Sequence, residues 1–212
     1  MIVKGFVHGG STVLDYALLY ILAKKYRLKK YMEIGTYIGG SINIMADICD
    51  VCYSVTAPPD APFSADSMCK KLNMPNFTDR LTRADNIIQF HANSYDFNFN
   101  QIEKDIDIYF IDAEHSYNAV YTDTANVFAH KKQDAFVVWH DIKGDIDRQR
   151  GLTLAVKDAI GNEFDNFYCV DNNLCGVYIP PKYQSDFPLH EWKYSKDDIL
   201  YTYKTELTVG IA

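Results

Sequence analysis

YMEIGTYIGGS, residues Tyr31–Ser41, is the stretch that decides the fold class of this chain. An apolar strand reaches an acid, Glu33, and a turn with Gly35 and Gly39 follows before Ser41 opens a helical stretch. The acid at the strand tip can hold an ammonium or a hydroxyl group, and the glycines let a ligand approach the backbone closely. The free N–H groups at the start of the next helix face the same crevice. The stretch therefore predicts a site for a small polar cofactor.

Strand-like and helix-like segments alternate along the rest of the chain. The apolar patterns predict strands at residues 30–34, 51–56, 86–91, 106–111, 135–139, 167–171 and 174–179. They predict helices after residue 12 and at residues 41–48, 64–72, 117–129 and 152–160. Asn172-Asn173 between the last two strands is a hairpin signal. The order predicts a three-layer α/β domain whose mostly parallel, seven-stranded sheet ends in an antiparallel hairpin.

The first helix has a recognisable start. Thr12 and Asp15 have the spacing of a capping box, in which each side chain binds the backbone N–H of the other residue. The apolar face of the helix is expected to consist of Leu14, Ala17, Leu18, Ile21 and Leu22.

Polar side chains follow four of the predicted strands at their carboxyl ends. Ligands bind at this edge of open parallel sheets, so these residues are expected to converge on one rim. They are Glu33 and Gly35, Asn93 and Ser94, Asp112 and His115, and His140 and Asp141. Because Asp112 and Asp141 end adjacent central strands, their carboxylates are expected to suit a hard divalent cation such as Mg²⁺.

Composition bounds the class of protein. The chain has 212 residues and a net charge of -7, so a generally basic nucleic-acid-binding surface is not expected. No apolar run is long enough to span a bilayer, and the N-terminus lacks the apolar core of a signal peptide. Five cysteines, an odd number, favour reduced thiols in the cytoplasm. We expect one domain at residues 1–181 and a Tyr-containing extension at residues 182–212 that is compatible with a homodimer.

Three segments resemble motifs of class I S-adenosylmethionine-dependent methyltransferases. The turn Glu33-x-Gly35-x-x-x-Gly39-x-Ser41 resembles their first motif. Residues 107–117, DIYFIDAEHSY, look like their fourth-strand motif, and residues 135–141, AFVVWHD, are similar to their fifth strand. The resemblance runs from about residue 11 to residue 180. It is closest to the metal-dependent O-methyltransferases of sugars and other small molecules, the macrolide sugar and cephamycin-pathway enzymes among them, and implies their Rossmann-like fold.

The resemblance also implies a role for each rim residue. Glu33 matches the acid that holds the amino acid end of S-adenosylmethionine, and His115 matches the base that takes the proton of the acceptor hydroxyl. The fourth-strand acid and the fifth-strand acidic pair of the sugar-modifying relatives hold magnesium, which implies Asp112, His140 and Asp141 as metal ligands. The other implied cofactor contacts are Gly35, Thr36, Gly39, Ser41, Asn93, Ser94 and Asp112. The implied acceptor is a hydroxyl of a small molecule, such as a sugar or a glycosylated metabolite.

Two positions depart from the family pattern. The second strand ends at Thr56, where the family has an acid for the ribose hydroxyls. His140 stands in place of a carboxylate, which favours Mn²⁺, Fe²⁺ or Zn²⁺ over Mg²⁺ or leaves the site without a metal. Two alternatives stay open: a binding protein of the same fold without methyl transfer, and an NAD-dependent oxidoreductase. The second is disfavoured because the turn lacks the G-x-G-x-x-G spacing.

Two further segments are interpreted more simply. Residues 145–150 contain two acids and two arginines and are expected to form a polar loop over the rim. Cys49-x-x-Cys52 is interpreted as a pair of buried thiols, because it joins a helix end to a strand start away from that rim.

Overall fold

The computed structural model describes residues 11–189, apart from residues 38, 63, 65, 66, 68, 69, 72–83, 143–145 and 172. Its strands are β1 (Lys30–Ile34), β2 (Val51–Thr56), β3 (Ile87–His91), β4 (Ile108–Ile111), β5 (Phe136–Trp139), β6 (Phe167–Cys169) and β7 (Gly176–Tyr178). Its α-helices are α1 (Val13–Tyr26), α2 (Gly40–Ala46), α4 (Tyr117–His130) and α5 (Ile146–Ile160). Short 3-10 helices lie at Phe99–Gln101, Gly161–Asn166 and Pro181–Asp186.

The strands form one seven-stranded sheet in the order β3-β2-β1-β4-β5-β7-β6. The pairs among β1 to β5 are parallel, whereas β7 runs antiparallel to both β5 and β6. The predicted fold class is therefore confirmed, including the antiparallel hairpin at the end of the chain. β1 pairs with β2 on one side and β4 on the other, so the strand order reverses at this point. Such a switch point opens a crevice at the carboxyl ends of the two central strands.

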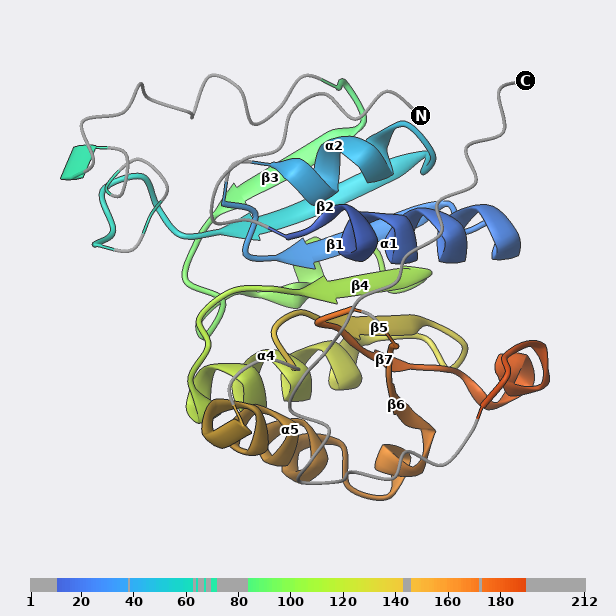
Figure 1. Cartoon of the computed structure of the whole chain (residues 1–212). Coiled ribbons are helices and arrows are strands. Elements are labelled where there is room, and N and C mark those ends of the chain that lie inside the picture. Colours follow the sequence, from blue (N-terminus) through green and yellow to red (C-terminus); the bar gives the residue numbers. More distant parts are fainter. Residues whose placement is uncertain are drawn as a thin grey trace.

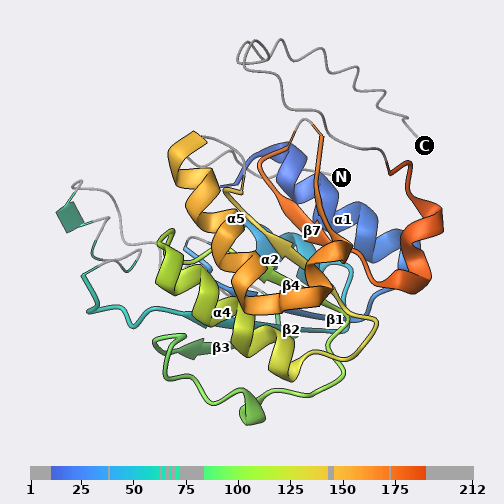
Figure 2. The same ribbon diagram turned by 90° about the horizontal axis from the view of Figure 1, so that it is seen from below.

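Helices cover both faces of the sheet (Figures 1 and 2). α1 and α2 pack on one face, where Leu19 and Ile42 belong to a buried apolar cluster. α4 and α5 pack on the other face, where Val127 and Val156 belong to a second cluster. Both faces of the central strands are buried, which explains why β4 and β5 consist of apolar residues alone.

The predicted apolar face of α1 is confirmed at Leu22, which is buried, and is wrong at Ile21. Ile21 is 58% exposed, and the residues of α1 that are fully buried are Asp15, Leu19, Leu22 and Ala23. The helix is apolar around most of its circumference, so the spacing of its apolar residues does not single out one side. The predicted capping box is confirmed, because Thr12 N donates to Asp15 Oδ2 over 2.6 Å and Asp15 N donates to Thr12 Oγ1 over 3.4 Å.

Several predicted boundaries also change. α5 begins at Ile146, so residues 146–150 belong to a helix and not to the expected loop over the rim. The two hairpin strands are shorter than predicted, at three residues each. Most of the predicted helix at residues 64–72 and the last part of the extension, residues 190–212, lie outside the described residues. Cys49 and Cys52 are buried, as expected. Among the described helices, none is long and apolar enough to cross a membrane.

Candidate functional site

Glu33 is a wholly buried carboxyl group next to the end of β1. Tyr31 Oη and Ser41 Oγ each donate to Glu33 Oε2 over 2.6 Å. Glu33 Oε1 has no hydrogen-bond partner in the part of the chain that the structure describes. Burial raises the pKa of Glu33 to about 7, although the hydroxyls of Ser41, Tyr31 and Thr36 act to lower it. A buried oxygen without a partner is rare in folded proteins, so its place fits a donor that comes from a ligand.

The turn after Glu33 is held close to the neighbouring strand end. Gly35 has a φ of +90°, and a Cβ there would lie 2.1 Å from the carbonyl oxygen of Asp112. This position requires glycine both for its left-handed backbone and for its contact with the residue after β4. Gly39 caps α2 with a φ of 77°. The buried Thr36 hydroxyl makes a hydrogen bond with Ser54 Oγ of β2, which fixes the middle of the turn.

Tyr16 of α1 lies against the start of α2. A Cβ at Gly40 would lie 2.2 Å from the Tyr16 hydroxyl oxygen, so a larger residue there would displace this hydroxyl. Burial raises the pKa of the Tyr16 hydroxyl, and the negative charges of Asp112, Glu33 and Asp15 raise it further. The hydroxyl of Tyr16 therefore lies among the carboxylates of the site. Sequence reasoning missed this residue, because nothing in the chain marks one tyrosine of an apolar helix as polar in function.

At the rim, the imidazole of His115 lies between two carboxylates. Its Nε2 atom is 3.3 Å from Asp112 Oδ1 and 3.2 Å from Asp141 Oδ2. Asp112 follows β4, His115 precedes α4, and Asp141 follows β5 with a φ of 55°. Their side chains are 18–28% exposed, so solvent and small molecules reach them. These three side chains could together hold a metal ion, since their ligand atoms all lie within 4.8 Å of one another.

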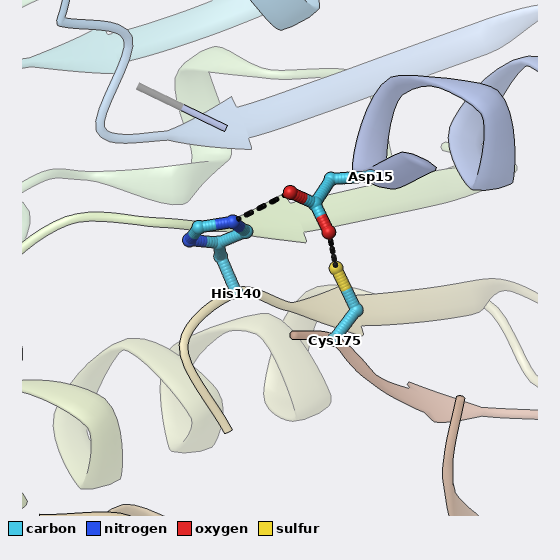
Figure 3. Close-up of side chains that lie close together, drawn as sticks. All are labelled: Asp15, His140 and Cys175. Atoms are coloured by element: carbon cyan, nitrogen blue, oxygen red, sulfur yellow. Dashed lines mark hydrogen bonds and ion pairs between the residues drawn. The ribbon is translucent and has the colours of Figure 1, made fainter. Parts of the chain in front are cut away.

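His140 is more deeply buried than the three rim side chains, and its imidazole is turned toward Asp15 of α1 (Figure 3). Its Nδ1 atom is 3.3 Å from both Asp112 Oδ1 and Asp141 Oδ1, and its Nε2 atom is 3.1 Å from Asp15 Oδ2. Cys175, just before β7, donates its thiol proton to Asp15 Oδ1 over 3.5 Å. The structure therefore brings both nitrogen atoms of His140 to carboxylates on two sides.

The charges of this network hold one another ionised. Burial alone would lower the pKa of His140, but its contacts with Asp112, Asp141 and Asp15 raise it to about 12. Burial would likewise raise the pKa of Asp112, and its contacts with His115 and His140 instead hold that pKa well below the usual range. The contact with His140 also lowers the pKa of Asp141. The centre of the site thus carries fixed negative charges around an imidazolium.

Two of the implied cofactor contacts, Asn93 and Ser94, follow β3. Asn93 is exposed and accepts the backbone N–H of Tyr95 over 3.1 Å, which forms a local turn. Ser94 makes a hydrogen bond with Asp123 of α4, a fully buried acid whose pKa burial raises to about 6. Asp123 Oδ1 has no partner in the described part of the chain. Thr56 is half-buried at the end of β2, where an acid was expected from the family pattern.

We compared the chain with models of protein families and with known proteins. The model of a family described as a methyltransferase domain matches residues 32–142, which is more than half of the chain. No curated protein matches the chain.

Solved structures match over most of the chain. An O-methyltransferase from Bacillus cereus in complex with S-adenosylhomocysteine is 14% identical with a TM-score of 0.55, over 82% of this chain and 84% of that one. A methyltransferase from Podospora anserina, PaMTH1, with S-adenosylhomocysteine bound, is 12% identical with a TM-score of 0.54, over 80% of both chains. A precorrin decarboxylase from Methanobacterium thermoautotrophicum, with a different reaction in its name, is 14% identical with a TM-score of 0.53, over 82% of this chain and 92% of that one. At these identities the likenesses establish the fold.

Proposed function

The chain belongs to the methyltransferase-domain family, and from this premise we propose that it transfers the methyl group of S-adenosylmethionine to a hydroxyl group of a small molecule. S-adenosylmethionine supplies an electrophilic methyl group on a sulfonium, and the chain's own residues must bind it, align the acceptor and remove the acceptor's proton. Family membership leaves the NAD-dependent alternative without support.

The proposed binding of S-adenosylmethionine depends on Glu33. Its Oε1 atom has no partner among the described residues, belongs to a carboxyl group that Ser41 contacts, and fits the ammonium group of an amino acid. An ammonium there would supply the missing hydrogen bond and the missing positive charge together. The S-adenosylhomocysteine complexes of the B. cereus and P. anserina proteins support a ligand of this kind.

One observation carries the choice of a hydroxyl acceptor: the imidazole of His115 lies 3.2 Å and 3.3 Å from two carboxylates at the solvent-accessible rim. Carboxylates that accept from an imidazolium stabilise it, so His115 is suited to take a proton from an acceptor hydroxyl. Asp112 and Asp141 then orient the ring and balance the charge that forms on it. An acceptor that is already nucleophilic without losing a proton would have no need of this arrangement.

A divalent cation is the second part of the proposal at the rim. Asp112 and Asp141 would hold it, with His140 Nδ1 within reach. When bound, such an ion lowers the pKa of a coordinated hydroxyl. Two carboxylates and an imidazole suit Mn²⁺, Fe²⁺ or Zn²⁺ better than Mg²⁺. We propose an acceptor that offers neighbouring hydroxyls, as sugars and glycosylated metabolites do.

A methyl-transfer assay tests this function. The full chain is incubated with isotopically labelled S-adenosylmethionine and a panel of sugars, glycosides and catechols, with and without Mn²⁺. Labelled product from a hydroxyl compound is expected, and Asp112→Asn should lower its rate strongly. Asp50→Asn is the control, because Asp50 is exposed at the opposite end of the strands in an ion pair with Lys29. Label found only on amines or thiols would refute the hydroxyl acceptor.

A further inference from the structure

A second group of metal-ligating side chains lies below the rim, in the interior. Asp15 comes from the first turn of α1, His140 directly follows β5, and Cys175 directly precedes β7 (Figure 3). Asp15 and Cys175 are fully buried and His140 is 9% exposed. One carboxylate oxygen, one ring nitrogen and the sulfur all lie within 4.8 Å of one another. Three segments far apart in the sequence thus bring three different ligand types to one point.

The separations between these atoms fit tetrahedral coordination. Zinc binds nitrogen and oxygen at about 2.0–2.1 Å and thiolate sulfur at about 2.3 Å, so tetrahedral neighbours lie about 3.3–3.6 Å apart. His140 Nε2 is 3.1 Å from Asp15 Oδ2, and Cys175 Sγ is 3.5 Å from Asp15 Oδ1. Asp15 presents one oxygen to each partner, so one carboxylate oxygen, the ring nitrogen and the sulfur can supply three ligands to a metal ion.

The surrounding contacts orient the ligands. His140 Nδ1 faces Asp112 and Asp141 at 3.3 Å, which leaves Nε2 turned toward Asp15. Thr12 donates its backbone N–H and its hydroxyl to Asp15 Oδ2 over 2.6 Å and 2.7 Å. A carboxylate behind a ligating imidazole and a donor behind a ligating carboxylate are the usual supports of a metal site.

We propose that Asp15, His140 Nε2 and Cys175 form a buried binding site for Zn²⁺ or a similar transition-metal ion, on the side of the His140 ring that faces away from the rim carboxylates. Thiolate, imidazole and carboxylate together suit this class of ion and not Mg²⁺ or Ca²⁺. Binding breaks the S–H bond of Cys175 and the Nε2–H bond of His140, and bonds from the metal to sulfur and nitrogen replace them. The two protons pass to solvent, so the charge of the interior is unchanged and no electron is transferred. The ion would tie α1 to the ends of two strands.

Cobalt spectroscopy on the full chain tests the site. The protein is stripped with a chelator, and Co²⁺ is titrated in while the absorption spectrum is recorded. A thiolate-to-cobalt charge-transfer band at one equivalent is expected, together with d–d bands of tetrahedral intensity. Among the described residues no cysteine lies at the rim, and loss of the band in Cys175→Ser would assign it to the buried site even if a second ion binds at the rim. Zn²⁺ should displace the cobalt and raise the melting temperature.

Two variants identify the cysteine that binds the metal ion. Cys175→Ser should abolish the charge-transfer band, and Cys49→Ser should leave it unchanged, because Cys49 is a buried thiol that donates to the Leu28 carbonyl instead. The spectrum of the unaltered protein decides the matter if a variant does not fold. Absence of a thiolate band in that spectrum, or its loss with Cys49→Ser and not with Cys175→Ser, would overturn the proposal. The three residues would then be a hydrogen-bonded network only.

Discussion

Glu33→Gln offers a direct test of the cofactor end of the site. Glu33 has its pKa raised from 4.5 to about 7 by burial, and no cation partners it among the described residues. Because the folded protein holds this proton more tightly than the unfolded chain, stability falls as the pH rises from about 4.5 to about 7. A pKa shift of this size corresponds to about 3 kcal/mol of unfolding free energy. This contribution is lost completely only at a pH above the pKa of Glu33 in the folded protein. Glu33→Gln should remove this part of the pH dependence.

The ammonium of a bound cofactor favours the ionised carboxylate, so cofactor binding and the ionisation of Glu33 are linked. Affinity for S-adenosylhomocysteine should rise about tenfold per pH unit below pH 7 and level off above it. Calorimetric titrations at a series of pH values, in two buffers of different ionisation enthalpy, would measure the affinity and the protons released. Glu33→Gln should bind about 10- to 100-fold more weakly at about pH 8 and show a flatter profile. An equal slope in both proteins would refute the reasoning, since another group would then be titrating.

Four further substitutions have expected outcomes. Gly35→Ala should lower the unfolding free energy by at least about 2 kcal/mol in denaturant titrations, because it combines a positive φ with a clash against the Asp112 carbonyl. Gly151→Ala, at an open position of α5, should instead stabilise the protein by about 0.5–1 kcal/mol. The two glycine substitutions should therefore change the unfolding free energy in opposite directions. His115→Ala should lower the rate of methyl transfer by about 100-fold or more and leave the affinity for S-adenosylhomocysteine within about threefold, as measured by steady-state kinetics and calorimetry. Tyr31→Phe removes one donor from Glu33, so the midpoint of the affinity profile should move up by about one pH unit.

The strands and the mostly parallel sheet with its terminal hairpin were predictable because the signal for each strand is local. The central strands are apolar on both faces, and the polar residues stand directly after them, so the pattern shows both where a strand lies and where it ends. Glu33, Asp112 and Asp141 were accessible to sequence reasoning for this reason. The length of α5 was not, since its polar first turns resemble a loop until packing selects the helix.

The partners of the site residues were beyond sequence reasoning. Asp15 was read as a helix cap, which it is, but the same carboxylate also meets His140 and Cys175. Cys175 was assigned to a hairpin strand without a role. No spacing in the chain encodes these contacts, because each joins elements that approach only through the tertiary fold. An acid inside the apolar start of α1 was the one signal available, and a cap explained it fully.

The wide sequence separation within this network bears on how the protein folds. Asp15 meets His140 across 125 residues and Cys175 across 160 residues. Contacts of such long range carry a large loop-closure entropy and form after the local helices and strand pairs. A buried carboxylate is also costly until its partners arrive, so the desolvation of Asp15 belongs to a late step. Substitutions in the network should therefore act mainly on the unfolding rate. The contacts that join the first helix to the last strand then determine the lifetime of the folded protein more than the speed of its folding.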